Sequence, residues 1–268
     1  MGLLAASDSG QEQSEDESSD GTDDASAGVS AAAAVDTQGI IFEELVWALR
    51  DHGTSDVGIS DATVKTLLPH LLLPLAGEGG ASRELAAVRL MRLITAMPEK
   101  GVARLAISFA GPLIRAYMGD GTSSERRGIL HALECLVLRA PTQMKVFVPQ
   151  LQSTYFRGLS DADDMVSCQA AAAIHKLLPL IPRGDGLLAS FTALLRSESA
   201  QQRRVLLSLR ETLAYLTSNA TSTLDWSKSA SLRARGIEMR EALQGLSVLQ
   251  ESDAGEAREA ALSFLKFE

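Results

Sequence analysis

Three proline-containing apolar segments recur along the chain at intervals of roughly 40 residues. They are LLPHLLLPLAGE from Leu67, FAGPLIRAYMGD from Phe109 and FVPQLQSTYFRGLSD from Phe147. In each segment an apolar residue lies shortly before a proline, and a glycine and an acidic residue close the unit. A fixed period of this length is typical of repeat proteins, in which each unit packs only on its neighbours. The repeat therefore limits the fold to stacked units of similar structure.

Apolar residues within and between these segments recur at helical spacing, and no segment shows sustained two-residue alternation. Aromatic content is only 4%, while alanine and leucine supply most of the apolar residues, which favours packed helices over a β-sandwich. The spacing predicts helices over 40–51, 63–76, 82–97, 102–118, 124–139, 142–159, 164–180, 186–196, 199–217, 231–248 and 255–267. The predicted fold is all α, a HEAT/armadillo-like α-solenoid of antiparallel helix pairs.

The second helix of each pair is expected to begin at a side chain that accepts the free amides of its first turn. The candidate N-caps are Ser82, Ser123 or Ser124, Asp163 and Ser199. The prolines at 69, 112 and 149 are expected inside the first helices, where each removes one backbone hydrogen bond and bends the helix. The stretch from Gly158 to Asp161 is predicted to form the corner between two helices.

The second helices each carry an apolar stripe that is predicted to face the core of the stack. The stripes are Leu85, Val88, Leu90, Met91 and Ile94; Ile129, Leu130, Leu133, Leu136 and Val137; and Val166, Ala170, Ala173, Ile174, Leu177 and Leu178. In the third proline-containing segment, the residues Phe147, Val148, Leu151, Tyr155 and Phe156 are expected to be mostly core. Stability should then come from the stacking of neighbouring units.

The net charge of −9 belongs to one end of the chain. Residues 1–38 hold nine acidic residues and no lysine or arginine, so the remainder is formally neutral. That composition predicts a disordered acidic, Ser-rich tail over 1–38. We expect a helix and linker over 39–62, a HEAT-repeat solenoid over 63–220, and divergent helices over 221–268 that form a further repeat or a cap.

Signals for export or membrane insertion are missing from the sequence. No basic segment precedes the apolar Leu3-Leu4 pair, and no apolar run approaches the roughly 20 residues of a membrane span. Cys135 and Cys168 form neither a CxxC pair nor a disulfide framework. A cytoplasmic location without a membrane partner is therefore expected, and whether the chain is a piece of a longer protein stays open.

Catalytic and metal-binding patterns are equally absent. The four histidines make no HxxxH or HExxH spacing, and His131 with Cys135 forms an i, i+4 pair without a second ligand pair. The acidic turn of Asp161, Asp163 and Asp164 lacks the closing glutamate of a calcium loop, and no GxSxG motif occurs. Basic residues are interleaved with acids rather than gathered. We predict no enzyme, cofactor or metal, and no direct sequence-specific nucleic-acid binding.

Two of the repeated segments carry a more specific signal. GPLIR at 111–115, followed one unit later by the Phe-x-Pro-Gln-Leu-Gln-x-Thr-x-Phe run that ends in Leu-x-Asp at 147–161, resembles the large HEAT-repeat translational activator of the general amino-acid control pathway, the stalled-ribosome sensor. The resemblance extends over about 64–195 and corresponds to the C-terminal HEAT region of that family. One departure is the start of the next helix, where the family usually carries a basic, Val-Arg-type sequence and this chain has Asp164-Met165-Val166-Ser167-Cys168-Gln169.

The resemblance implies a function that the pattern alone does not. The family associates with ribosomes and activates the starvation-responsive kinase that phosphorylates initiation factor 2 alpha, through a segment that binds the RWD domain of the kinase. The implied role is a non-catalytic scaffold that binds a protein partner, with Arg115, Gln150, Gln152 and Arg157 as candidate surface contacts. A generic HEAT-repeat adaptor in protein transport or complex assembly, unrelated to translation, stays open as the alternative.

Overall fold

A computed structural model describes residues 40–47 without 41 and 45, and residues 61–76, 80–197, 201–218, 229–246 and 252–265. The chain divides into two compact units, Met1–Glu44 and Leu45–Glu268. In the first unit the described residues, Ile40 and Phe42–Glu44, are helical. The predicted tail over 1–38 lies outside the described residues, as does most of the predicted linker.

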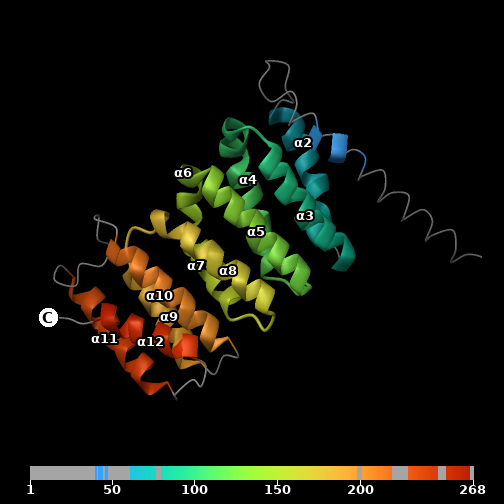
Figure 1. The fold of residues 1–268 in the computed structure, drawn as a ribbon. Coiled ribbons are helices and arrows are strands. Elements are labelled where there is room, and N and C mark those ends of the chain that lie inside the picture. The colour runs from blue at the N-terminus through green and yellow to red at the C-terminus, as the bar shows by residue number, and fades with distance from the viewer. Residues whose placement is uncertain are drawn as a thin grey trace, which may run out of the picture. The chain divides into compact units, whose positions relative to one another are not determined.

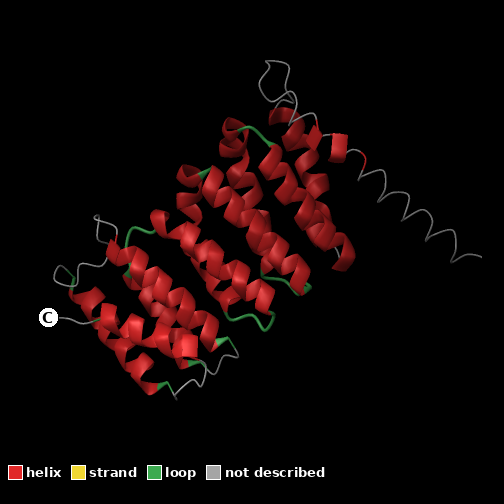
Figure 2. Cartoon of the chain, in the orientation of Figure 1, coloured by secondary structure: helices red, strands yellow, loops and turns green. Residues whose placement is uncertain are grey.

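The second unit consists of helix pairs, and every regular element in its described part is helical (Figure 2). The first helices of the pairs are α2 (Asp61–Leu72, continued by the 3-10 turn η1, Leu73–Ala76), α4 (Glu99–Tyr117), α7 (Val148–Leu159), α9 (Asp185–Arg196) and α11 (Ala230–Gly245). The second helices are α3 (Gly80–Ala96), α5 (Ser123–Arg139), α8 (Asp164–Leu177, continued by η3, Leu178–Leu180), α10 (Gln202–Ser218) and α12 (Ser252–Phe264). Short elements α6 (Pro141–Met144) and η2 (Lys145–Phe147) precede α7.

The pairs stack in order within this unit (Figure 1). Second helices pack on second helices, α3 on α5, α5 on α8, α8 on α10 and α10 on α12. First helices likewise contact the next first helix, from α2 through α4, α7 and α9 to α11. This two-layer arrangement confirms the predicted all-α solenoid.

The last two described helices lie at the C-terminal end of the stack. Helix α11 packs on α9, and α12 packs on α10, so the two helices continue both layers of the stack. Arg258 of α12 ties the pair together, because its Nε donates to the carbonyl oxygen of Leu243 at 2.8 Å. The predicted domain boundaries at 38, 62 and 220, and the choice between a further repeat and a cap over 221–268, stay predictions.

The three prolines differ in their position within the helices. Pro69 and Pro112 lie inside α2 and α4, as expected. A proline removes the hydrogen bond to the carbonyl four residues earlier, and Lys65 and Ser108 at those positions are exposed to solvent. Pro149 instead lies in the first turn of α7, where its missing amide costs no helical bond. The prediction that Pro149 bends the helix from inside is wrong.

The helix starts are predicted correctly in only one case. The Asp163 carboxylate accepts from the amides of Met165 at 2.9 Å and Val166 at 3.1 Å, which confirms it as the cap of α8. Thr122 caps α5 by accepting from the Glu125 amide, so the cap lies one residue before the predicted serines. Helix α3 begins at Gly80, which places Ser82 inside the helix. Ser199 lies outside the described residues.

The apolar stripes of α5 and α8 are buried as predicted, but the stripe of α3 is partly wrong. Leu85 and Val88 are 38% and 39% exposed, and the buried positions around them are Ala86 and Ala87. Helix α5 approaches α3 closely here, since a Cβ added to Gly128 would lie 3.1 Å from the Ala87 Cβ. Small side chains therefore face α5 at this point, where Leu85 and Val88 are exposed, while the larger Leu90, Leu93 and Ile94 of α3 are buried.

Gly158 is a packing residue of α7 rather than part of the corner, because the helix continues to Leu159. A Cβ added to Gly158 would lie 2.9 Å from both the Ala170 Cβ and the Tyr117 hydroxyl oxygen. Real Cβ atoms do not approach that closely, so glycine lets α7 lie against α8 and α4.

Ion pairs join successive units where the second helices begin. The Arg126 guanidinium donates to both carboxylate oxygens of Asp161, at 2.8 and 3.1 Å, across the corner that follows α7. The Arg204 guanidinium pairs with the Asp164 carboxylate at 2.7 Å, linking α10 to α8. The Asp164 carboxylate thus contacts the next second helix of the stack.

Candidate protein-binding surface

Helix α7 positions three of the four candidate contact residues. Its buried face consists of Val148, Leu151, Thr154, Tyr155, Phe156, Gly158 and Leu159. Gln150 and Arg157 lie off this face and are exposed, while Gln152 is half-buried. Phe147, expected in the core, is also only half-buried. The helical spacing therefore separates the polar candidates from the core, as the sequence predicted.

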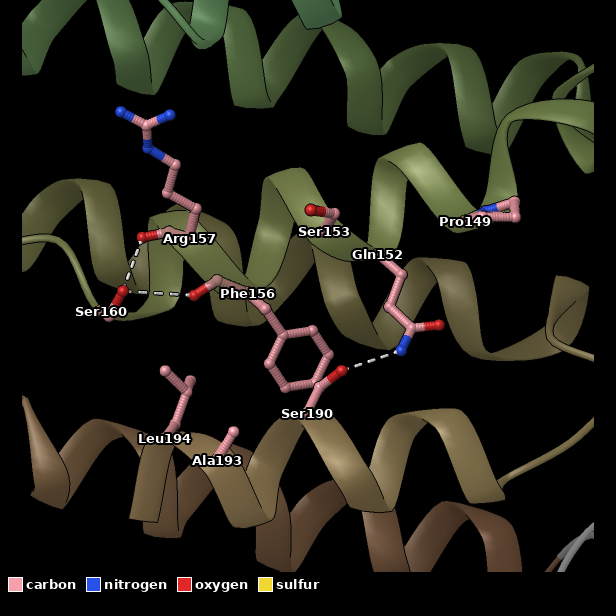
Figure 3. A pocket seen from close by; sticks show the side chains of 9 residues that line it. All are labelled: Pro149, Gln152, Ser153, Phe156, Arg157, Ser160, Ser190, Ala193 and Leu194. Carbon is pink, nitrogen blue, oxygen red and sulfur yellow. Dashed lines mark hydrogen bonds between the residues drawn. The ribbon is translucent and has the colours of Figure 1, made fainter. Parts of the chain in front are cut away.

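Gln152 belongs to the junction between α7 and α9. Its side-chain amide nitrogen donates to the Ser190 hydroxyl oxygen at 3.1 Å, and that hydroxyl donates to the Gly186 carbonyl at 3.1 Å. Figure 3 shows the Gln152 side chain reaching from α7 to Ser190 on the facing helix. A side chain held in this way fixes the separation of the two helices as well as lining the surface between them.

Arg157 points away from α9 (Figure 3). Its guanidinium nitrogen Nη1 lies 3.5 Å from the sulfur of Met118, the residue at the C-terminal end of α4. A thioether is a weak acceptor and carries no charge, so the positive charge of Arg157 is not neutralised by this contact.

A groove of about 470 Å³ runs between α7 and α9. The residues that line it are Pro149, Gln152, Ser153, Phe156, Arg157, Ser160, Ser190, Ala193 and Leu194. The Phe156 ring forms its floor and meets Phe191 edge to face, with ring centroids 4.7 Å apart and an interplanar angle of 78°. Serine and glutamine side chains lie around this apolar floor, so the groove offers both apolar contact and hydrogen-bonding groups.

The structure brings only two of the four candidate residues together. Gln152 and Arg157 line the same groove, about 7.5 Å apart along the helix axis. Gln150 is exposed in the first turn of α7 and does not line the groove. Arg115 is exposed in the last turn of α4, outside the groove. The involvement of all four residues in partner binding stays a prediction.

Sequence reasoning missed the wall of the groove that α9 supplies. Ser190, Ala193 and Leu194 lie three and four residues apart, on the helix face opposite the buried Leu188 and Leu195. That spacing is a readable signal, but the fourth unit lacks the proline that aligns the others. Without that alignment, the sequence does not indicate which face of α9 meets α7.

Two buried ionisable side chains beneath this surface have raised pKa values. Burial, together with the nearby Asp161 carboxylate, raises the pKa of Tyr117 to about 12, so its phenol stays neutral. The Glu125 side chain is fully buried, with its Oε2 atom 3.3 Å from the Arg83 Nε. Burial raises the pKa of the Glu125 carboxyl and outweighs the opposing effect of Arg83. These groups belong to the packing between units and do not reach the groove.

His131 and Cys135, the i, i+4 pair noted in the sequence, are not joined by further metal ligands in the described ranges. His131 is exposed and Cys135 is half-buried on α5, and burial raises the pKa of the Cys135 thiol. In the described ranges, His, Cys, Asp and Glu side chains nowhere gather in groups of three or more that could hold a metal ion.

None of the helices that the structure describes combines the length and apolarity needed to span a bilayer.

Solved structures support the fold. An engineered protein superposes with a TM-score of 0.51 at 15% identity, covering 86% of this chain and 90% of that chain. At this level of identity the likeness concerns the fold alone. No protein-family model matches the chain.

Curated proteins give a more specific match. The chain is 32% identical to the Arabidopsis thaliana protein ILITYHIA over 54% of its own length. It is 32% identical to the Saccharomyces cerevisiae eIF-2-alpha kinase activator GCN1 over 46% of its length, and 31% identical to the Homo sapiens stalled ribosome sensor GCN1 over 52%. The two GCN1 names describe an activator and a sensor rather than an enzyme, in agreement with the non-catalytic prediction.

The chain spans only 5% of the length of each of these relatives. The similarity therefore concerns one region of much larger proteins. The resemblance to the large HEAT-repeat translational activators is confirmed for about half of this chain.

Proposed function

We propose that the chain acts as a non-catalytic HEAT-repeat scaffold in translational control, which binds and helps to activate the kinase that phosphorylates initiation factor 2 alpha. The observation that carries this proposal is the 31–32% identity to GCN1 proteins named as a kinase activator and as a ribosome sensor. The proposed setting is the cytoplasm, in association with ribosomes. The proposed direct partner is the RWD domain of the starvation-responsive kinase.

The contact surface that we assign to this partner lies on α7 and the end of α4. Arg157 and Arg115 offer exposed guanidinium groups there, and Gln152 and the groove beside it add hydrogen-bonding and apolar contacts. Arginine residues often dominate binding energy at interfaces, because the planar group donates several hydrogen bonds at once. Gln150 extends the same helix surface toward its N-terminal turn.

A pull-down of the RWD domain with the full chain tests the proposal. Wild-type protein should retain the domain, while Arg115→Glu and Arg157→Glu should each weaken retention by about tenfold or more. Arg127→Glu is the matched control, because Arg127 is an exposed arginine on α5, in the other layer of the stack. Retention that is equal for all four proteins would contradict the assigned surface, and no retention by wild type would contradict the kinase partner.

Sedimentation with polysomes separates this proposal from a generic adaptor role. Tagged full-length chain expressed in cells under amino-acid starvation should appear in ribosomal fractions and leave them when polysomes are dissolved with EDTA. Absence from these fractions, combined with no RWD binding, would favour an adaptor with no link to translation.

A further inference from the structure

Three arginines occupy the last turns of successive first helices. Arg115 ends α4, Arg157 ends α7 and Arg196 ends α9. All three are exposed, and they follow one another at the spacing of the repeat. We call these three residues the arginine row. Arg196 was not among the residues that the sequence suggested.

Contacts place the three helix ends along one edge of the stack. The Arg157 guanidinium meets Met118 at the end of α4, so the ends of α7 and α4 are adjacent. The Gln201 side chain, after α9, donates to the Ala162 carbonyl oxygen after α7 at 3.3 Å. The row therefore follows a continuous edge rather than three separated points.

The arginine row differs in its bonding from the arginines that join the units. Arg126 and Arg204 are paired with the carboxylates of Asp161 and Asp164. Among the residues that the structure describes, no carboxylate lies within 4.0 Å of the row, and Asp161, close to Arg157 in sequence, is already bonded to Arg126. Three cationic groups with no carboxylate that close create a local positive edge on a stack whose sequence is formally neutral beyond residue 38.

The groove between α7 and α9 opens beside the centre of this edge. Phe156 and Leu194 give it an apolar floor and wall, and Ser153 and Ser160 place hydroxyl groups at its border. The Ser160 hydroxyl already donates to the Arg157 carbonyl oxygen at 3.0 Å, while its oxygen can still accept a hydrogen bond. A leucine-sized side chain fits a groove of about 470 Å³ with room for the backbone around it.

We propose that this edge binds an acidic segment of a protein partner, which places an apolar side chain in the groove and carboxylates on the arginine row. The inference rests on the proposed function, because it names the chemistry through which the partner would use the same surface. Neighbouring helices pack roughly 8–10 Å apart, and an extended chain advances about 3.3 Å per residue. Two carboxylates that meet adjacent arginines should therefore stand about three residues apart in the segment.

Fluorescence anisotropy with a labelled peptide tests this inference on the full chain. The probe is an extended nonapeptide with two aspartates three positions apart and a leucine between them, measured at low salt. Arg157→Glu, at the centre of the row, should raise Kd by about tenfold or more, and Arg196→Glu should raise it less. Replacing the peptide leucine by glycine should also raise Kd by about tenfold, because the apolar contact is lost.

The control for charge alone is Arg127→Glu, which changes net charge equally but lies on α5. Its Kd should stay within about twofold of wild type. An equal effect of Arg127→Glu and Arg157→Glu would overturn the inference, as would a peptide whose binding ignores the leucine or is displaced equally well by RNA of the same charge. If the RWD domain binds but the peptide does not, the inference fails alone. If neither binds, the proposed function fails with it.

Discussion

The substitution Gly158→Ala tests whether the stack depends on the close approach of α7 to its neighbours. The added Cβ would meet the Ala170 Cβ and the Tyr117 hydroxyl oxygen at 2.9 Å, and the Leu130 Cδ1 at 3.1 Å. All three contacts come from buried side chains, and the Ala170 Cβ has no rotatable bond that could move it away. The α7 backbone must therefore move, by several tenths of an ångström, to restore separations of about 3.5–4.0 Å.

Two opposing effects set the change in the free energy of unfolding that Gly158→Ala should cause. Alanine favours a helix interior over glycine by about 0.5–1 kcal/mol, whereas overpacking a tight core costs about 1–3 kcal/mol. The expected net result is a loss of about 1–2 kcal/mol in the free energy of unfolding. For a domain of this size, that loss corresponds to a fall in Tm of about 2–8 °C.

Thermal melting followed by circular dichroism at 222 nm measures this change, and Gly255→Ala supplies the control. A Cβ added to Gly255 meets nothing within 4 Å, and the residue lies in α12. The same chemical change should there stabilise the protein by about 0.5–1 kcal/mol, through helix propensity alone. If Gly158→Ala melts at or above the wild-type temperature, the packing argument for α7 is wrong.

Three further predictions concern the contacts between units. Burial raises the pKa of the Glu125 carboxyl in the folded state, so the folded protein takes up a proton more readily than the unfolded chain. Wild type should therefore gain stability relative to Glu125→Gln as pH falls toward 4.5. Urea melts that show the same difference in stability at every pH would contradict this. The hydrogen bond from the Val166 amide lowers the pKa of the Asp163 carboxyl. Asp163→Ala should therefore lower Tm at pH 7, and the difference in Tm from wild type should disappear as pH falls below 3.8. An equal difference in Tm at pH 2.5 would argue against capping. Arg126→Met should cost about 1–3 kcal/mol through its bonds to Asp161, and unchanged urea melts would show that the pair contributes nothing.

The buried face of a helix could be predicted from the sequence where the large apolar residues are also the buried ones. In α5 and α8 the residues of the predicted apolar stripes are buried, so helical spacing identified them correctly. In α3 the close approach of Gly128 to Ala87 leaves room only for a small side chain at that point. Hydrophobicity alone then selects Leu85 and Val88, which are exposed. Spacing predicts which face of a helix is buried, but not how closely the next helix approaches.

Local details were harder to predict when several residues could play one role. Thr122 is followed directly by two serines, and any of the three hydroxyls could cap α5. The choice depends on where the backbone turns, which hydroxyl chemistry does not encode.

The candidate site was predicted in part for a related reason. The polar positions of α7 follow from its own spacing, so Gln152 and Arg157 could be selected from the sequence. The contact of Gln152 with Ser190, and the contribution of Leu194, depend on how α7 and α9 align. That alignment arises from packing between units and cannot be predicted from the sequence of either helix alone.

Hydrogen–deuterium exchange of the full chain, with and without the RWD domain of the kinase, measures whether the ends of the first helices contact that domain. We expect slower exchange at the C-terminal turns of α4, α7 and α9 and in the corners that follow α4 and α7, with no change in α3 or α5. Protection confined to the second helices α3, α5 and α8, or no protection at a concentration of domain that saturates binding, would contradict it.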